Sequence, residues 1–169
     1  MALITNKYKQ LAVITFLFFL ISSCEQTIVK PTVPFNPQEI ENALKEGNST
    51  ITGQAFAKTQ GGDVKYGAGN TINLIPLTPY VEQAINLSNK ANAFTTVDID
   101  KRMFDYAKKT TADGTGKFKF TDLSSGKYYL ETDIKWQYQT QYGLQTTGGT
   151  VKGIANIEND GDTVEIILQ

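Results

Sequence analysis

Histidine is absent from this chain of 169 residues, and cysteine occurs only once, as Cys24. Without histidine the protein lacks the commonest general base and every nucleophile that depends on a neighbouring imidazole. Zinc sites are also disfavoured, because their usual ligands are His and Cys. We therefore expect a non-catalytic protein that carries no metal and no other cofactor. The remaining route to catalysis is an enzyme built on carboxylates, Lys or Tyr alone.

An excess of charge of either sign is missing as well. The formal net charge is −1, from 16 basic and 17 acidic residues. Nucleic-acid binding needs basic residues clustered on one face, so we expect no nucleic-acid partner. The length suits a single domain with a sizeable core.

A long hydrophobic run is also lacking. The longest apolar stretch without charge, Leu11–Ile21, is shorter than the roughly 20 residues that cross a bilayer. It follows Lys7 and Lys9 and precedes small residues, which is the layout of a secretory signal peptide. The sequence predicts a signal peptide at residues 1–23, cleaved between Ser23 and Cys24.

The end of this segment, Ile21-Ser22-Ser23-Cys24, resembles the lipobox of bacterial lipoproteins. The resemblance implies a lipid, such as palmitate, on Cys24 and a mature protein anchored to a membrane of the cell envelope. Two or three acyl chains hold a protein far more firmly than one. Glu25 at the next position favours the outer membrane by the same resemblance and leaves open the periplasmic or the surface face. The alternative is an ordinary signal peptide with a chance cysteine.

Residues 24–48 have the composition of a tether. Pro31, Pro34 and Pro37 recur every third residue, a spacing that favours an extended, semi-rigid segment. Asn36 and Pro37 suit the cap and first position of a short helix. We expect this segment to hold the following domain clear of the lipid surface.

The domain at residues 49–169 has the pattern of a β-protein. Between residues 127 and 138 one face is apolar and the other polar, which is typical of an antiparallel sheet with one wet face. Shorter strands are predicted at residues 50–55, 71–75, 117–120, 151–157 and 163–168. Residues 139–150 fit either a loop or a hairpin. About seven strands with regular turns predict an antiparallel β-sandwich.

An insert at residues 77–107 interrupts the β pattern. Tyr80, Ala84 and Leu87 recur at helical spacing after Thr78 and Pro79, so we predict an amphipathic helix at 79–92. Residues 93–106 fit either a loop or a second short helix. Connections this long are often functional, which makes the insert the first place to look for a specific role.

Residues 111–130 resemble the signature of the carboxypeptidase regulatory-like domain. The matching positions form a turn, a Phe-x-Phe strand and a Tyr-x-Leu strand: Asp113, Gly116, Phe118, Phe120, Leu123, Gly126, Tyr128 and Leu130. The resemblance covers roughly residues 49–135 and the last strand. It implies an Ig-like sandwich of the transthyretin (prealbumin) type, in a group whose members are commonly non-catalytic modules for assembly, adhesion or ligand binding.

Two functions agree with these features. The first is a structural or interaction module whose partner, such as another envelope protein, is unknown. The alternative is a carbohydrate-binding module in which exposed aromatic rings stack on a glycan, with Tyr129, Tyr138 and Tyr142 as candidates. Trp136 is a further candidate, although its alternation with polar residues favours a place in the core.

Two groups of acidic residues suggest a calcium site or a glycosidase, but each has a simpler interpretation. Asp98, Asp100 and Asp105 match no calcium-loop spacing, so we interpret them as a solvated acidic loop. Glu131 and Asp133 share a strand face, as a glycosidase pair might be arranged, but no cleft-forming scaffold is indicated.

By analogy with adhesin-type repeats, Lys58 and Asn156 are conceivable partners in an isopeptide bond beside Glu131. No local pattern predicts the burial that such a bond requires, so ordinary surface positions are expected for both residues.

Overall fold

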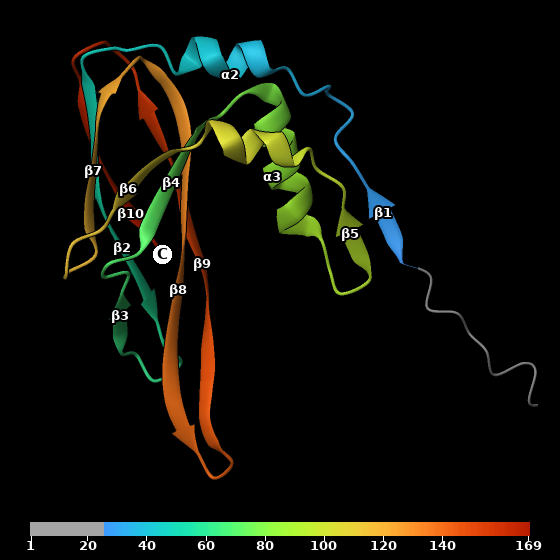
Figure 1. Ribbon diagram of the computed structural model, residues 1–169, viewed down its shortest axis with the longest axis vertical. Helices are drawn as coiled ribbons and strands as arrows, with labels where there is room; N and C mark the ends of the chain where they lie inside the picture. The colour runs from blue at the N-terminus through green and yellow to red at the C-terminus, as the bar shows by residue number, and fades with distance from the viewer. Residues whose placement is uncertain (1–25) are drawn as a thin grey trace, which may run out of the picture.

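The computed structural model describes residues 26–169, so Ser23, Cys24 and the predicted signal peptide lie outside the described residues. Across the described range the chain forms two four-stranded sheets, a two-stranded ribbon and three helical segments. The two sheets face each other; the helical segments of residues 79–106 lie on one side of the pair, and that of residues 37–43 lies at its end (Figure 1). This arrangement confirms the predicted β-sandwich. No helix within residues 26–169 combines the length and the apolar composition needed to cross a membrane.

The first sheet is built around β2 (Ser49–Lys58). This strand pairs antiparallel with β7 (Lys117–Leu123) and β3 (Val64–Tyr66), and parallel with β10 (Thr163–Leu168). The parallel pair differs from the purely antiparallel sandwich that the sequence predicted. It arises because the turn at 159–162, which the sequence did predict, carries the chain from the second sheet into the first.

The second sheet has the order β6 (Lys108–Thr111), β4 (Thr71–Pro76), β8 (Gly126–Thr140) and β9 (Gly143–Ile157), and its pairs are antiparallel. Strands β8 and β9 pair along their whole length and project beyond the sandwich as a long hairpin (Figure 1). The structure therefore settles residues 139–150 as part of a hairpin and not a loop.

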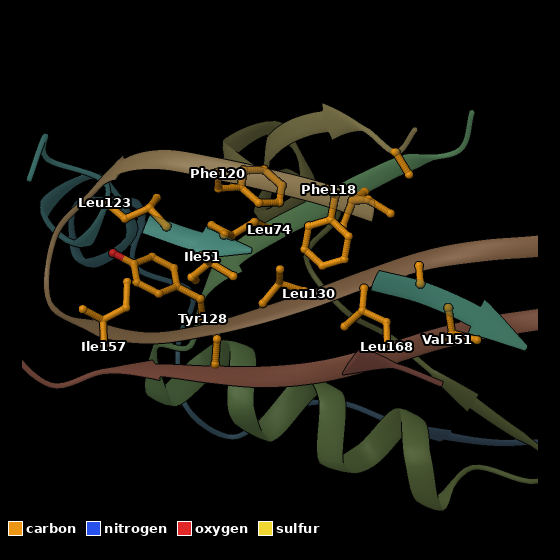
Figure 2. Packing of buried hydrophobic residues seen from close by; sticks show 14 of the residues in the cluster. Ile51, Leu74, Phe118, Phe120, Leu123, Tyr128, Leu130, Val151, Ile157 and Leu168 are labelled. Atoms are coloured by element: carbon orange, nitrogen blue, oxygen red, sulfur yellow. The ribbon is translucent and has the colours of Figure 1, made fainter. Parts of the chain in front are cut away.

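The main core lies between the two sheets, and the signature residues supply much of it (Figure 2). Phe118 and Phe120 lie on one face of β7 with their ring centroids 6.2 Å apart in an edge-to-face arrangement, a favourable geometry for aromatic pairs. Leu123, Tyr128 and Leu130 are buried beside them. The period-2 pattern of the sequence thus predicted the buried face of these strands correctly.

The Asp-Gly turn before β7 has a structural role. The Asp113 carboxylate accepts hydrogen bonds from the Thr115 hydroxyl and backbone N–H, both at 2.8 Å, and from the Lys117 N–H at 3.0 Å. These bonds, that of the Thr115 hydroxyl foremost, lower the pKa of Asp113. Gly116 has φ +78°, and a Cβ there would lie 2.5 Å from the Ala55 carbonyl oxygen. Glycine is required at this position for both reasons.

The insert forms three elements on the outer face of the second sheet (Figure 1): α3 (Pro79–Lys90), β5 (Thr95–Val97) and the 3₁₀ helix η1 (Lys101–Tyr106). The Thr78 side chain caps α3 by accepting a hydrogen bond from the Val81 N–H. The predicted helix is confirmed, although it ends two residues earlier than 92.

Of the predictions for residues 24–48, the short helix capped by Asn36 is confirmed, whereas the described residues do not form a free spacer. Strand β1 (Thr27–Val29) pairs with β5, and helix α2 (Pro37–Ala43) buries Ile40 completely. These elements close a second core with the insert, formed by Ile40, Ile75, Tyr80, Val81, Ala84 and Met103.

The local chemistry of this segment explains the error. Proline spacing predicts an extended backbone, but it does not say what the intervening side chains contact. Val33 and Phe35 pack on the second core, and Phe35 meets the Tyr80 ring edge-on with the centroids 5.2 Å apart. The Gln83 side-chain oxygen accepts hydrogen bonds from the backbone N–H groups of Thr32 and Val33, at 3.0 and 2.9 Å. An extended segment whose donors are satisfied in this way is docked and does not act as a free tether.

Candidate functional site

A polar groove crosses the outer face of the second sheet. In the strand register Asn73 lies opposite Glu131, and Asp133 lies opposite Thr150. These residues alternate with core residues, so their side chains face away from the sandwich core. The groove has a volume of about 630 Å³ and is lined by Gly69, Asn70, Thr71, Asn73, Glu131, Thr132, Asp133 and Thr150.

A smaller cleft of about 210 Å³ continues from the groove to the insert. It shares Glu131 and Thr150 with the polar groove, and its remaining lining comes from α3, η1 and the sheet: Ala84, Ile85, Ser88, Asn89, Ile99, Met103, Phe104, Tyr129 and Lys152. The Phe104 ring is 39% exposed at its wall. A polar floor and an apolar wall therefore adjoin at the same place on the sheet.

Tyr129 lies under this cleft and is not the exposed stacking platform that the sequence predicted. Its side chain is only 7% exposed, and its hydroxyl donates a 2.9 Å hydrogen bond to Glu131 Oε2. Burial raises the pKa of the Tyr129 hydroxyl well above its usual range, and the neighbouring carboxylate adds to the effect. The hydroxyl therefore stays protonated and positions the Glu131 carboxylate.

The second carboxylate of the groove is held from the neighbouring strand. Asp133 Oδ1 accepts a 2.6 Å hydrogen bond from the Thr150 hydroxyl, and Oδ2 lies 3.7 Å from Lys135 Nζ. This ion pair is solvent-exposed and contributes little to stability. Asn70 Nδ2 donates a 2.6 Å hydrogen bond to the Asp133 carbonyl oxygen and holds this edge of the polar groove in place. The sequence placed Glu131 and Asp133 on one face correctly, but the expectation that no cleft exists there is wrong.

The other two predicted stacking residues lie on the hairpin. Tyr138 is 48% exposed, and Tyr142, at the turn, is 84% exposed. Alternation along β8 places Tyr138 on the same face as Trp136 and on the opposite face from Glu131. Trp136 is half-buried against the main core, as its alternation predicted. The three tyrosines therefore do not form one site.

Of the acidic residues in the insert, Asp98 and Asp105 are exposed and Asp100 serves local structure. Asp100 caps η1 by accepting from the Arg102 N–H at 3.0 Å, and its carboxylate pairs with the Arg102 guanidinium at 2.6 Å. The side-chain hydrogen bond from Arg102 lowers the pKa of Asp100. In the described part of the chain no group of three or more Asp, Glu, Cys or His side chains is placed to hold a metal ion.

The isopeptide pair is not assembled. Lys58 and Asn156 are both exposed and belong to different sheets, β2 and β9. Neither position provides the buried surroundings that the bond would need.

The sequence did not single out Asn73, Asn70 or Thr150 as site residues. One signal was present at Asn73, because Asn is disfavoured in the middle of a strand unless its side chain has a role. The partners of Asn73 could not be found in this way, since they depend on register between strands about 60 residues apart in the chain.

Comparison with known proteins adds to the picture of the fold. No protein-family model matches the sequence, and the comparison with curated proteins gives no match. The resemblance to the carboxypeptidase regulatory-like domain therefore stays a prediction. Among solved structures, the chain is similar to the crystal structure of a Pseudomonas aeruginosa protein for which carbohydrate binding has been proposed. The TM-score is 0.65 at 22% identity, over 80% of this chain and 98% of the other. At this level of identity the similarity shows a shared fold.

Proposed function

We propose that this protein is a non-catalytic carbohydrate-binding module, held at the bacterial cell envelope by a lipid on Cys24. The observation that carries the proposal is the polar groove, in which side-chain amides, carboxylates and hydroxyls converge on an open face. A sugar ring presents hydroxyl groups that both donate and accept hydrogen bonds, and these groups match such a lining.

The adjoining cleft supplies the second half of sugar recognition. Pyranose rings have an apolar face of C–H groups, which binds to aromatic and aliphatic side chains. Phe104 and Ile99 provide that surface at the end of the groove, with the buried Met103 beneath them. The proposed stacking residue is therefore Phe104 of the insert, in place of Tyr138 and Tyr142 on the hairpin.

The charge of the groove narrows the ligand class. The groove lining includes two carboxylates, Glu131 and Asp133, and no Lys or Arg, whereas Lys152 lines the adjoining cleft. Like charges facing each other in an interface are costly, so an acidic sugar is disfavoured against the carboxylates of the groove itself. Neutral glycans and amino sugars fit this chemistry.

The fold and the sequence support the proposal in different ways. The P. aeruginosa protein shares the fold, and the carbohydrate binding proposed for it supports the same kind of ligand here. The lipobox motif at Ile21-Ser22-Ser23-Cys24 supports the anchor, and Glu25 at the next position favours the outer membrane. A protein partner captured by the insert has less support, because α3 and η1 are packed into the second core and do not form a free arm.

Glycan binding by residues 26–169, which contain every described element, tests the proposal. We expect neutral or amine-bearing oligosaccharides to bind on a glycan array, with affinities then measured by calorimetry. Asn73→Ala and Asp133→Asn should each weaken binding about tenfold or more, since the first removes the side-chain amide and the second replaces a charged acceptor oxygen by an amide donor.

Tyr142→Ala is the matched control and should leave affinity unchanged, because the residue lies at the hairpin turn. Binding that survives both groove variants but is lost in Tyr142→Ala would place the site on the hairpin. A protein that binds none of the neutral, amino or acidic glycans would contradict the proposal altogether.

A further inference from the structure

The β1–β5 ribbon has an exposed apolar face that none of the described residues covers. In its parallel register Ile28 lies opposite Thr96, and the alternation of side chains places both on one side. Ile28 is 69% exposed, and Phe94, in the turn that immediately precedes β5, is 59% exposed. On the other side Val29 and Val97 are half-buried. Two large apolar side chains therefore stand at the outer edge of the molecule.

The position of Cys24 limits what can face this ribbon. Cys24 precedes Ile28 by four residues, and an extended chain spans at most about 3.6 Å per residue, or about 14 Å in all. The headgroup region on each side of a bilayer is roughly 5–7 Å thick. Thr27 N–H is already hydrogen-bonded to the Phe94 carbonyl, so the described fold begins within three residues of Cys24.

We propose that the exposed face of the β1–β5 ribbon, with Ile28 and Phe94, docks on the bilayer that holds the lipid of Cys24. The inference rests on the anchor in the proposed function and adds an orientation to it. Lys30 directly follows β1 and Asp98 directly follows β5, and both are exposed, so these two charges offset each other and contact with the bilayer relies on the apolar side chains.

This orientation places the insert between the membrane and the sandwich. In Figure 1 the ribbon lies on one side of α3 and the two sheets lie on the other. Docking through the ribbon therefore places the sheets on the side of α3 that is away from the membrane. The N-terminal segment then works as a docked mount with a fixed geometry, where the sequence had predicted an extended, semi-rigid spacer.

Site-directed spin labelling of the full, acylated protein tests the orientation. Cys24 is the only cysteine, and acylation removes its thiol, so Ile28→Cys or Phe94→Cys introduces a single labelling site. Tyr142→Cys, at the hairpin turn, is the control. In vesicles of phosphatidylethanolamine and phosphatidylglycerol, labels at 28 and 94 should be several-fold more accessible to oxygen than to a water-soluble nickel chelate. The label at 142 should show the opposite preference.

The remaining outcomes contradict the proposal in distinguishable ways. Labels at 28 and 94 that are as water-accessible as the one at 142 overturn the orientation while leaving the anchor intact. Spin–spin broadening between labels at 28 shows that a second copy covers the ribbon, which also overturns it. Labelled palmitate that is not incorporated, or that is incorporated equally in Cys24→Ala, overturns the anchor and the docking with it. Glycan binding by residues 26–169 is measured separately and does not depend on any of these results.

Discussion

The docked N-terminal segment can be tested through Ile40, which the sequence placed in a spacer and the structure buries completely. Helix α2 carries this side chain into the second core, where it packs together with Ile75 and Val81. Two hydrogen bonds reinforce the contact with the sandwich, because the Ser124 and Tyr128 hydroxyls both donate to the Ala43 carbonyl, at 2.9 and 3.2 Å. Ile40→Ala should therefore destabilise the whole fold.

The magnitude follows from the buried atoms. Ile→Ala removes three carbon atoms, and at about 0.8 kcal/mol per buried methylene the transfer term is roughly 2.4 kcal/mol. The cavity left behind adds to this, and measured Ile→Ala changes in cores fall at about 2–5 kcal/mol. We expect a loss of about 2–4 kcal/mol in the free energy of unfolding. A residue in a free spacer would contribute almost nothing.

Urea unfolding of residues 26–169 measures this loss with two signals. Trp136 is the only tryptophan and lies against the main core, so its fluorescence reports on the sandwich, while circular dichroism reports on the helices as well. Both signals should shift to a lower midpoint in Ile40→Ala. Glu41→Ala, on the exposed side of the same helix, should stay within about 0.5 kcal/mol of the parent. An Ile40→Ala change as small as that of Glu41→Ala would refute the docking of α2.

Two further predictions concern turns that hold the sandwich. The backbone N–H and side-chain amide of Asn48 donate hydrogen bonds to the Asp160 carboxylate and lower its pKa. The stabilisation that these bonds give is complete above the unfolded pKa of about 3.9 and is lost as the pH falls through the folded pKa. The free energy of unfolding should therefore drop less steeply below pH 4 in Asp160→Asn than in the parent, and equal slopes would contradict this role. Gly116→Ala should cost about 2 kcal/mol or more, from the left-handed φ and the clash with Ala55, as measured by urea unfolding. Gly114→Ala, in the same turn with no atom within 4 Å of its Cβ, should change stability by less than about 1 kcal/mol.

Local patterns predicted much of the sandwich because the relevant forces are local. Alternation from Tyr128 to Ile134 marks one buried face, and it did so correctly because successive side chains on a strand point to opposite sides. The Asp113 turn was also readable, since Asp bonds its own backbone and Gly116 tolerates positive φ. The same reasoning failed at Tyr129, whose outward face is covered by an insert that no strand pattern can place.

The sequence alone determined which side chains belong to the core of each strand and where the turns fall, and it predicts where a lipid would be attached. Each of these depends on neighbours within a few residues. The tertiary structure decided the parallel entry of β10, the docking of α2 and the groove formed by Asn73, Glu131 and Asp133. These features arise from register and packing between segments far apart in the chain, which are fixed only when the apolar surfaces of the whole molecule are buried together.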